Sequence, residues 1–359
     1  MRIAGSGSYL PATAVDNYKL YELPSIRNAF DVEQARVALR DVDPAEAEGF
    51  APEEVFHRWA LQVTGISRRR ILDRDRDRST EWMCAEACRR ALEHAGMEAE
   101  DVDFLAAASL TAKEIVPNLA CTVGDLLGIP TVGGQVVNTA CAGFIYALAA
   151  GYGFIASGVA RNVLVVSGDT LSTIADYTDP KTAVLFGDGA GAVVLSGDRG
   201  RGRVLGPPYM VADYSPTHLN LANPTWQSPG TPLPKLGMAG GPHVLRQAIK
   251  AMLDAADQAL KRADLEWRDV DFVIPHQANR RITQGIAKIV AARGVQAVID
   301  TIEDYGNVSA STVPIALDEL LRGGHGSLPE TARIVLTAVG GGYTTASAVI
   351  DWSGSGGSG

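Results

Sequence analysis

The chain has 359 residues, 46% of them apolar and 20% charged, which is typical of a globular protein with a large core. It carries 32 Lys and Arg against 41 Asp and Glu, and the net charge of −9 disfavours non-specific binding to nucleic acid. Gly, Asp or Arg interrupts the longest apolar runs before they could span a bilayer, so no membrane segment is expected.

The termini and the cysteines predict where the protein works. The N-terminal sequence MRIAGSGSYLP has no apolar stretch long enough for a signal peptide. Four cysteines, Cys84, Cys88, Cys121 and Cys141, are too few for a disulfide framework in a chain of this length. We therefore expect a cytoplasmic protein. Cys84 and Cys88 lie four apart on a predicted helix and are badly spaced for a metal site, which favours core packing, and no metal is predicted.

Basic residues gather in two segments, SRRRILDRDRDR (67–78) and ANRRI (278–282). Two interpretations of these segments stay open. They form either a solvated face or a local patch that docks an acidic partner.

One segment of the first half recurs in the second. Residues 91–104, ALEHAGMEAEDVDF, align without a gap with residues 259–272, ALKRADLEWRDVDF, at an offset of 168, and eight of the fourteen positions are identical. Each copy predicts the end of an amphipathic helix, a turn and a buried strand. RNVLVVSG (161–168) resembles RIVLTAVG (333–340) in the same way. The period is far too long for a solenoid and indicates two related halves.

Within each half, predicted helices alternate with continuous apolar strands such as NVLVVSG and RIVLTAV, which is typical of sheets buried on both faces. We therefore predict a layered α/β fold with halves at 1–200 and 201–352, related by a pseudo-twofold axis. The tail SGSGGSG at 353–359 predicts a flexible linker.

The segment NTACAGF (138–144) places Cys141 directly before an apolar, helix-like run. A helix N-terminus lowers the pKa of a thiol, and the small neighbours leave room for a substrate. An offset of 168 leads from Cys141 to Ser309, in GNVSAST, which also precedes an apolar run. The two helix starts are expected to face each other at the junction of the halves, where ligand sites often form. Taken alone, the motif fits an inert buried cysteine better than a nucleophile.

Three more segments contain residues that could act together with Cys141. His276 follows a buried strand in VIPHQANRRI, Asn307 begins a helix in DYGNVSAST, and three glycines follow a strand in AVGGGYTTAS. Singly, these are consistent with a core histidine, a helix cap and a tight turn. The glycine turn also lets backbone N–H groups approach a reacting oxygen. Together with Cys141 they are what acyl transfer through a thioester requires.

The chain resembles the β-ketoacyl-acyl-carrier-protein synthase III family of the thiolase superfamily in five motifs: NTACAGFIYAL, LFGDGAGAVVL, HQANRRI, GNVSASTVPIALDE and GGGYTTASA. The resemblance covers nearly the whole chain in the family's order. It implies a thiolase-like αβαβα layered fold of two pseudo-twofold-related halves and an acyltransferase that needs no cofactor beyond acyl thioesters. It also implies a homodimer that works with acyl-carrier protein on acyl and malonyl thioesters.

The resemblance gives each site residue a role. Cys141 corresponds to the acylated nucleophile, and His276 and Asn307 to the groups that stabilise the enolate left by decarboxylation. The backbone N–H groups of Cys141 and Gly341 correspond to the oxyanion hole. Substrate-binding positions are Trp59, Val116, Phe186, Gly340 and Gly342, and the positions that dock the carrier protein are Arg280, Arg281 and Lys288.

Three departures from the family pattern concern the substrate entrance. A longer stretch than usual precedes Trp59, which predicts an additional helical and loop insertion at about 20–57. Trp59 matches a tryptophan that stacks on the adenine of coenzyme A, but Pro180 stands at its arginine partner's position and Val63 replaces a basic residue. A carrier-protein-borne or unusual acyl donor is therefore favoured. Val116 replaces a phenylalanine that closes the acyl pocket of the partner subunit, which predicts longer or branched acyl groups.

The leading hypothesis is a condensing enzyme of fatty-acid, polyketide or other secondary metabolism. It would load an acyl group on Cys141 and join it, by decarboxylative Claisen condensation, to a malonyl-type thioester on acyl-carrier protein. A non-decarboxylating acyltransferase on the same fold stays open. A non-catalytic partner subunit is disfavoured because Cys141, His276 and Asn307 are all retained. The sequence names neither the primer nor the pathway.

Overall fold

A large central sheet carries the layered architecture. In the computed structural model, which describes residues 1–40, 42–73, 75, 79–215, 219–221, 235–238, 242–326 and 328–352, the strand order is β13-β12-β14-β15-β8-β1-β7-β6-β4-β5, with β9 paired to β15. The tail predicted at 353–359 lies outside the described residues, as do Arg74, Arg76 and Arg78 of the first basic segment. None of the helices within the described part of the chain is long and apolar enough to cross a bilayer.

Half of the sheet is built from the first part of the chain. Its strands are, in spatial order, β5 (Gly133–Val137), β4 (Phe104–Ala108), β6 (Asn162–Thr170), β7 (Asp188–Ser196) and β1 (Arg2–Tyr9). The first three are parallel, and each of the remaining pairings is antiparallel. The parallel strands are almost free of charged residues because helices cover both of their faces.

The second half of the sheet repeats this plan with later residues. Its strands are β13 (Ala297–Val298), β12 (Phe272–Pro275), β14 (Arg333–Gly340), β15 (Gly342–Asp351) and β9 (Tyr209–Ser215). Again three parallel strands are followed by two antiparallel pairings. The short strand β8 (Gly202–Val204) pairs with both β1 and β15 and joins the two arrays. The identical order and direction are the arrangement expected of duplicated halves.

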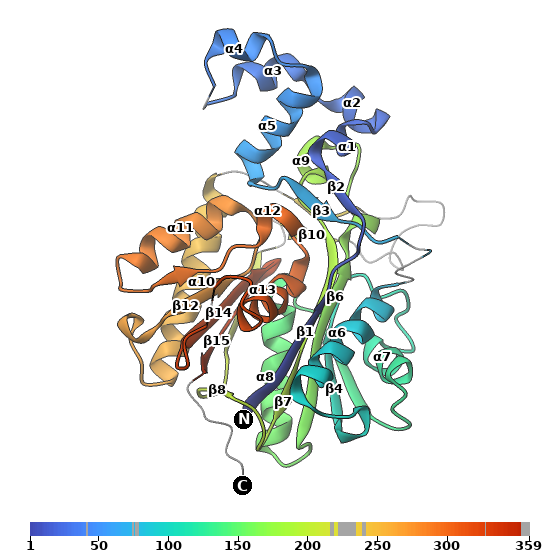
Figure 1. Cartoon of the computed structure of the whole chain (residues 1–359), viewed down its shortest axis with the longest axis vertical. Helices are drawn as coiled ribbons and strands as arrows, with labels where there is room; N and C mark the ends of the chain where they lie inside the picture. Colours follow the sequence, from blue (N-terminus) through green and yellow to red (C-terminus); the bar gives the residue numbers. More distant parts are fainter. Residues whose placement is uncertain are drawn as a thin grey trace.

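Two helices, α8 (Gly143–Ala156) and α13 (Thr312–Leu321), lie between the arrays (Figure 1). Helix α8 packs on β4 and β6 of one array and on β14 and β15 of the other, and α13 likewise contacts both. Helix α8 has no charged residue, and eight of the ten residues of α13 are buried. Helices that are apolar on all sides are stable only when they are enclosed.

Amphipathic helices cover the outer faces of the sheet. Helices α6 (Thr80–Ala95) and α7 (Leu119–Leu127) cover the first array, and α10 (Pro242–Arg262) and α11 (Arg280–Ala291) cover the second (Figure 1). The order helix, sheet, helix, sheet, helix confirms the predicted layered α/β fold. Side chains set the helix starts: Ser79, Asn118 and Asn279 accept backbone hydrogen bonds at the N-termini of α6, α7 and α11.

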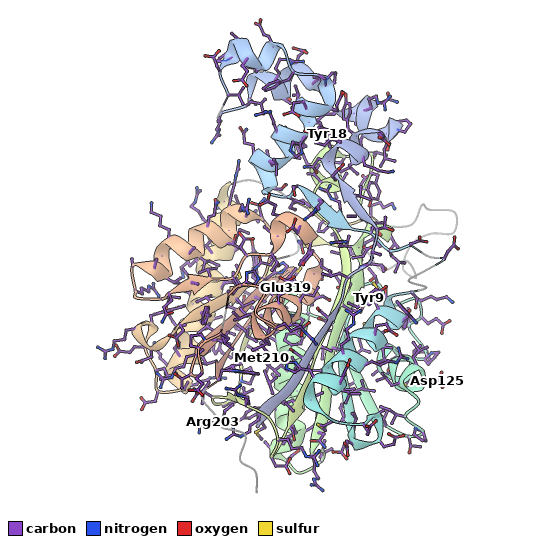
Figure 2. The ribbon with its side chains drawn as sticks, in the orientation of Figure 1. Tyr9, Tyr18, Asp125, Arg203, Met210 and Glu319 are labelled. Atoms are coloured by element: carbon purple, nitrogen blue, oxygen red, sulfur yellow. The ribbon has the colours of Figure 1, made fainter. Side chains whose placement is uncertain are left out.

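Helix α6 approaches β1 closely because β1 carries glycine at the contact. A Cβ at Gly5 would lie 2.3 Å from the carbonyl oxygen of Ala91, and one at Gly7 would lie 2.4 Å from that of Ala87. No side chain larger than hydrogen fits there. At the end of β1, the ring of Tyr9 packs edge-on against Trp82 of α6 with centroids 5.0 Å apart; Figure 2 labels Tyr9.

Residues 17–40 and 42–64 form a group of short helices at one end of the molecule (Figure 1). These are α1 (Asn17–Tyr21), α2 (Pro24–Ala29), α3 (Val32–Val37), α4 (Pro44–Glu48) and α5 (Pro52–Thr64). Their core is an aromatic cluster of Tyr21, Phe30, Phe56 and Trp59. Helices therefore occupy the segment at 20–57 where the sequence predicts an insertion. Tyr18, labelled in Figure 2, donates to Glu54 Oε2 at 2.5 Å and stacks on His57.

The remaining elements are short. They comprise β2 (Ala14–Asp16), β3 (Arg68–Arg70), α9 (Pro180–Ala183), β10 (Leu219–Asn220), β11 (Gly237–Met238) and α12 (Ile302–Tyr305). Strands β2 and β3 form a ribbon that connects the N-terminal helices to the rest of the chain.

Arg69 of β3 fastens this ribbon from inside. The side chain is only 1% exposed, and its guanidinium donates to Val15 O at 3.1 Å, Asn17 Oδ1 at 2.8 Å and Val184 O at 2.9 Å. All three acceptors are neutral. Burial lowers the pKa of Arg69 to about 10.

We predict that Arg69→Met lowers the free energy of unfolding by about 3 kcal/mol, because three acceptors, two of them buried, lose their donor. Urea denaturation measures the change. The matched control is Arg68→Met, which removes an exposed ion pair with Asp304 (2.7 Å) and should cost less than about 1 kcal/mol. Equal losses for the two variants would show that Arg69 has no special structural role.

Candidate active site

A cavity of about 300 Å³ lies where the two halves meet. Its polar lining comes mainly from residues that the sequence singles out: Cys141, His276, Asn307, Arg281 and the glycines 340–342. Apolar side chains make up much of the remaining wall, and Phe186 is among them. The structure thus brings the predicted nucleophile, histidine, asparagine and glycine turn together around one space.

Two matching turns form the centre of the site. The 3-10 turn Ala140–Ala142 leads into α8, and the 3-10 turn Ser309–Ser311 leads into α13. The turns pack against each other. The two turns correspond at an offset of 169, so the counterpart of Cys141 is Ala310 and not Ser309, as the offset of the sequence repeat suggests. Ser309 matches Ala140, and both have left-handed backbones, with φ 51° and 47°.

Cys141 is buried, with 8% of its surface exposed. The Ser309 hydroxyl donates to its sulfur across 3.8 Å. Burial raises the pKa of the Cys141 thiol to about 12, although the Ser309 hydroxyl acts to lower it. The sequence predicts a lowered pKa at a helix start. That prediction is wrong in direction because desolvation of the thiolate outweighs the favourable dipoles.

His276 lies at the end of β12, where its backbone N–H donates to Thr337 O at 2.8 Å. Burial lowers the pKa of His276 to about 3, so the imidazole is neutral near pH 7. Its Nδ1 lies 2.7 Å from the hydroxyl of Thr312, which is placed to donate to Ser309 O at 3.0 Å and accepts from the Gln277 N–H at 3.3 Å. When the single hydroxyl proton turns instead to Nδ1, which is the shorter contact, the proton of the neutral ring must be on Nε2. Nε2 is then a donor for the cavity.

Asn307 presents its amide nitrogen as a second donor. Its Oδ1 accepts from the Ser309 N–H at 2.9 Å, which fixes the orientation of the side chain amide. The backbone of Asn307 is held on both sides, by N–H donation to Leu185 O and by acceptance from Gly187 N–H. No residue in the described part of the chain accepts from Nδ2, so this group is available to a ligand in the cavity.

The glycine turn between β14 and β15 lies against the residues that precede the nucleophile. A Cβ at Gly340 would lie 2.5 Å from Thr139 O and 2.9 Å from the Cys141 nitrogen. Thr344 Oγ1 donates to Thr139 O at 2.8 Å and holds the two segments together. Only glycine permits this approach. Gly341 and Cys141 both line the cavity, as the predicted oxyanion hole requires.

Two predicted substrate-binding residues lie away from the described lining of the cavity. Trp59 packs on Phe30 and Phe56, with ring centroids 5.0 and 5.7 Å apart. Val116 is 85% exposed, next to Ile115, which is 77% exposed. Their assigned roles stay predictions.

The three basic residues assigned to docking differ in their surroundings. Arg280 is paired with Glu303 at 2.7 Å and Asp300 at 3.5 Å. Arg281 is exposed and lines the cavity. It donates to the backbone carbonyl of Gln62, and because this acceptor is neutral, the contact does not compensate the charge of the guanidinium. Lys288 is also exposed and lies two turns further along α11, on the same face.

Some lining residues carry no signal that sequence reasoning could use. The apolar wall includes Leu236 and, from the first turns of α10, Val244, Leu245 and Ala248. Thr312 does carry a signal, since it places a hydroxyl at a helix start five residues after Asn307. Within the described ranges, no cluster of three or more His, Cys, Asp or Glu is arranged to hold a metal ion. The site is an apolar pocket with a thiol, a neutral imidazole and an amide donor.

Comparison with known families gives two matches. The family model described as 3-oxoacyl-[acyl-carrier-protein (ACP)] synthase III matches residues 137–209. The model of the C-terminal part of the same enzymes matches residues 260–352. The first match contains Cys141, and the second contains His276, Asn307 and the glycine turn.

Curated relatives cover almost all of the chain. Beta-ketoacyl-[acyl-carrier-protein] synthase III of Chlorobium luteolum is 36% identical over 302 residues, which are 82% of this chain and 90% of that protein. The enzyme of the same name from Xanthomonas axonopodis pv. citri is 35% identical over 353 residues, 97% of each chain.

Solved structures agree with these relatives. A 3-oxoacyl-[acyl-carrier-protein] synthase III from Aquifex aeolicus superposes with a TM-score of 0.79 at 30% identity, over 98% of this chain and 99% of that one. The priming β-ketosynthase from the R1128 polyketide biosynthetic pathway gives 0.80 at 29% identity, over 98% and 95%. These similarities confirm the predicted thiolase-like layered fold of two related halves.

We predict that Thr312 selects the tautomer of His276. Nitrogen-15 NMR of the imidazole should show the Nε2–H form in the unsubstituted protein. Thr312→Val removes the hydroxyl from Nδ1, so the spectrum should shift to a mixture of tautomers, whereas Thr312→Ser should keep the Nε2–H form. The pKa of His276 should stay low in all three, since burial is its cause. A single unchanged tautomer in Thr312→Val would contradict the assignment.

Proposed function

Because the chain belongs to the 3-oxoacyl-[acyl-carrier-protein] synthase III family, a family of condensing acyltransferases, we propose that Cys141 carries an acyl group and transfers it to a malonyl-type thioester on acyl-carrier protein with loss of CO₂. The observation that carries the proposal is the single cavity shared by Cys141, His276, Asn307 and the glycine turn. These residues come from both halves of the fold.

In the first half-reaction, the sulfur of Cys141 attacks the carbonyl carbon of an acyl thioester and the S–H proton leaves. The carbonyl oxygen becomes negative and accepts hydrogen bonds from the backbone N–H groups of Cys141 and Gly341. The bond to the donor thiol then breaks, which leaves an acyl-cysteine. Fixed N–H donors stabilise such an oxygen by about 3–4 kcal/mol each because they need no reorganisation.

In the second half-reaction, the malonyl thioester loses its carboxylate as CO₂ and becomes an enolate. The enolate oxygen accepts hydrogen bonds from His276 Nε2–H and Asn307 Nδ2–H. The enolate carbon attacks the acyl carbonyl, and Cys141 leaves as a thiolate. The apolar lining favours decarboxylation because it raises the free energy of the charged malonyl carboxylate. It also strengthens the two hydrogen bonds to the enolate. No cofactor is needed in this scheme, and we assign the reaction to the cytoplasm.

The surroundings of Trp59 favour a donor carried by acyl-carrier protein over coenzyme A. One neighbour of the Trp59 ring is Phe30, which belongs to the N-terminal helices, and Pro180 stands where an arginine would assist adenine binding. Phe30 therefore competes with an adenine for the Trp59 ring, and no arginine at position 180 assists its binding.

We further propose a homodimer in which a second copy covers the exposed Ile115 and Val116. Exposed neighbouring apolar side chains mark surfaces that bind another protein. Val116 would then reach the acyl pocket of the partner subunit. Since valine is smaller than phenylalanine, the pocket would accept longer or branched acyl groups of fatty-acid or polyketide metabolism.

The proposal predicts that the protein, malonyl-acyl-carrier protein and a suitable acyl thioester together yield CO₂ and a β-ketoacyl product. Intact-protein mass spectrometry with a panel of acyl thioesters identifies the group on Cys141. His276→Ala and Asn307→Ala should acylate normally but lose condensation by about a hundredfold, the usual cost of one such donor. Cys141→Ala should not acylate, whereas Cys121→Ala, which removes an exposed thiol, should behave as the unsubstituted protein.

The same experiment separates the alternatives. Acyl-Cys141 without malonyl turnover would instead indicate a non-decarboxylating acyltransferase. Failure of Cys141 to take up any acyl group would favour a non-catalytic subunit. Acceptance of acetyl alone would contradict the argument from Val116.

Arg281 and Lys288 provide a test of carrier-protein docking. We predict that Arg281→Glu raises the KM for malonyl-acyl-carrier protein roughly five- to tenfold by repelling an acidic partner. Acylation by a small thioester should be unchanged. Arg161→Glu, a charge reversal at a side chain that is 84% exposed, is the control. Equal KM values for the two variants would place the docking surface elsewhere.

A further inference from the structure

A buried carboxylate lies behind Cys141, outside the cavity lining. Asp169 of β6 is completely buried. Its Oδ1 accepts hydrogen bonds from Ser109 Oγ at 3.0 Å, Leu110 N–H at 2.7 Å and Thr111 Oγ1 at 3.0 Å. Its Oδ2 is also buried, but among the residues that the structure describes it has no hydrogen-bond partner. Buried polar atoms are almost always paired, so an unpaired carboxylate oxygen calls for a functional explanation.

Ser309 stands between this carboxylate and the thiol. The turn that begins with Ser309 packs against β6, and the Ser309 hydroxyl lowers the pKa of Asp169. The same hydroxyl lies 3.8 Å from Cys141 Sγ, and Ser309 is fully buried. A hydroxyl has one proton and rotates about its C–O bond. It can therefore donate to the sulfur in one state and to Asp169 in another.

We propose that Ser309 and Asp169 form a proton relay for Cys141, an inference that rests on the proposed function. The S–H proton passes to Ser309 Oγ while the Ser309 hydroxyl proton passes to Asp169 Oδ2. The products are a thiolate and a neutral carboxylic acid. Asp169 keeps the proton while Cys141 is acylated and returns it by the same path when condensation expels the thiolate. The departing donor thiolate takes its proton from solvent, which balances the single proton that condensation consumes.

The charges of the site support this route. Transfer from Cys141 to Asp169 moves one negative charge within a buried region, whereas ionisation of the thiol alone would create a second one there. His276 is a poor store for the proton because burial lowers its pKa to about 3. Burial raises the pKa of Asp169 to about 6. Ser309 contacts the reacting sulfur, and Asp169 acts through it as a positioning residue.

If Asp169 had only a structural role, neutralising it would change the reaction rate of Cys141 in the opposite direction. Its negative charge raises the pKa of Cys141. If Asp169 did nothing else, its neutralisation would make the thiol more acidic and faster to react. A relay requires that neutralisation make Cys141 slower. The direction of the change therefore distinguishes the two roles.

The test uses the full chain with Asp169→Asn, Ser309→Ala and the double variant. Asn keeps an oxygen for the Leu110 N–H. Single-turnover acylation by butyryl-N-acetylcysteamine is followed by intact-protein mass spectrometry. Each single variant should lower the maximal acylation rate on the order of a hundredfold, with the half-saturating concentration unchanged. The double variant should be no slower than the slower single variant, because both act on one path.

Asp188→Asn is the matched control. Asp188 is equally buried, and burial raises its pKa to about 6 as well, but its partners are the Leu72 N–H and Ser172. This variant should lower the melting temperature as much as Asp169→Asn and leave acylation within about twofold. An equal loss of acylation in Asp188→Asn would overturn the relay.

Two further measurements keep the test decisive. If Asp169→Asn does not fold, the acylation rate is measured as a function of the deuterium fraction of the solvent. A bowed curve for the unsubstituted protein and a linear curve for Ser309→Ala would show that two protons move together, as the relay requires. Identical curves for the two proteins would overturn the relay. Alkylation of Cys141 by iodoacetamide needs no acyl donor. Slower alkylation in Asp169→Asn supports the relay even if condensation is never found, and equal or faster alkylation overturns it.

Discussion

Desolvation of the space between α8 and α13 governs the chemistry of this protein. Both helices are enclosed by the two arrays of strands, so the polar groups at their N-terminal ends have almost no contact with water. Burial consequently raises the pKa of Cys141 to about 12 and that of Asp169 to about 6, and lowers that of His276 to about 3. Every one of these shifts favours the uncharged form. A buried site of this kind can hold neutral hydrogen-bond donors in position, whereas a charge that forms there must be balanced by the loss of a charge or by an opposite charge nearby.

The duplicated topology explains how such a place arises. Each half sends one helix into the middle layer, and each of these helices follows a 3-10 turn whose first residue has a left-handed backbone. The pseudo-twofold relation brings the two turns together, and each half then contributes different residues to the site. Cys141 belongs to one turn, while His276 and the glycine turn follow strands of the other half. A single undivided half would present a thiol to solvent without its donors.

Much of this could be predicted from the sequence because it depends on local patterns. The apolar strands, the repeat of 91–104 and the residues at segment ends were sufficient for the fold and for the shared cavity of Cys141, His276 and Asn307. What could not be predicted depends on contacts between distant side chains. The thiol pKa reflects complete enclosure, which no local motif records.

The same limit applies to individual partners. Phe30 lies against Trp59 only because short helices fold back on α5, and Asp169 meets Ser309 across 140 positions of chain. The one-residue difference between the repeat offset and the helix offset is another case. It arises between Phe104 and Ala140, outside the segment that the sequence repeat covers.

The junction strand β8 has a consequence for biosynthesis. Arg203, labelled in Figure 2, pairs with Arg2 of the first strand and with Asp351 of the last. Strand β1 also needs β7, whose Ser196 faces Arg2. A polypeptide that leaves the ribosome N-terminus first must hold its β1 strand without these neighbours until those residues emerge. The pairing of β8 with β15 forms only after Asp351 has been synthesised. Because the described ends flank one three-residue strand, a circularly permuted chain that opens elsewhere would assemble the same molecule in a different order.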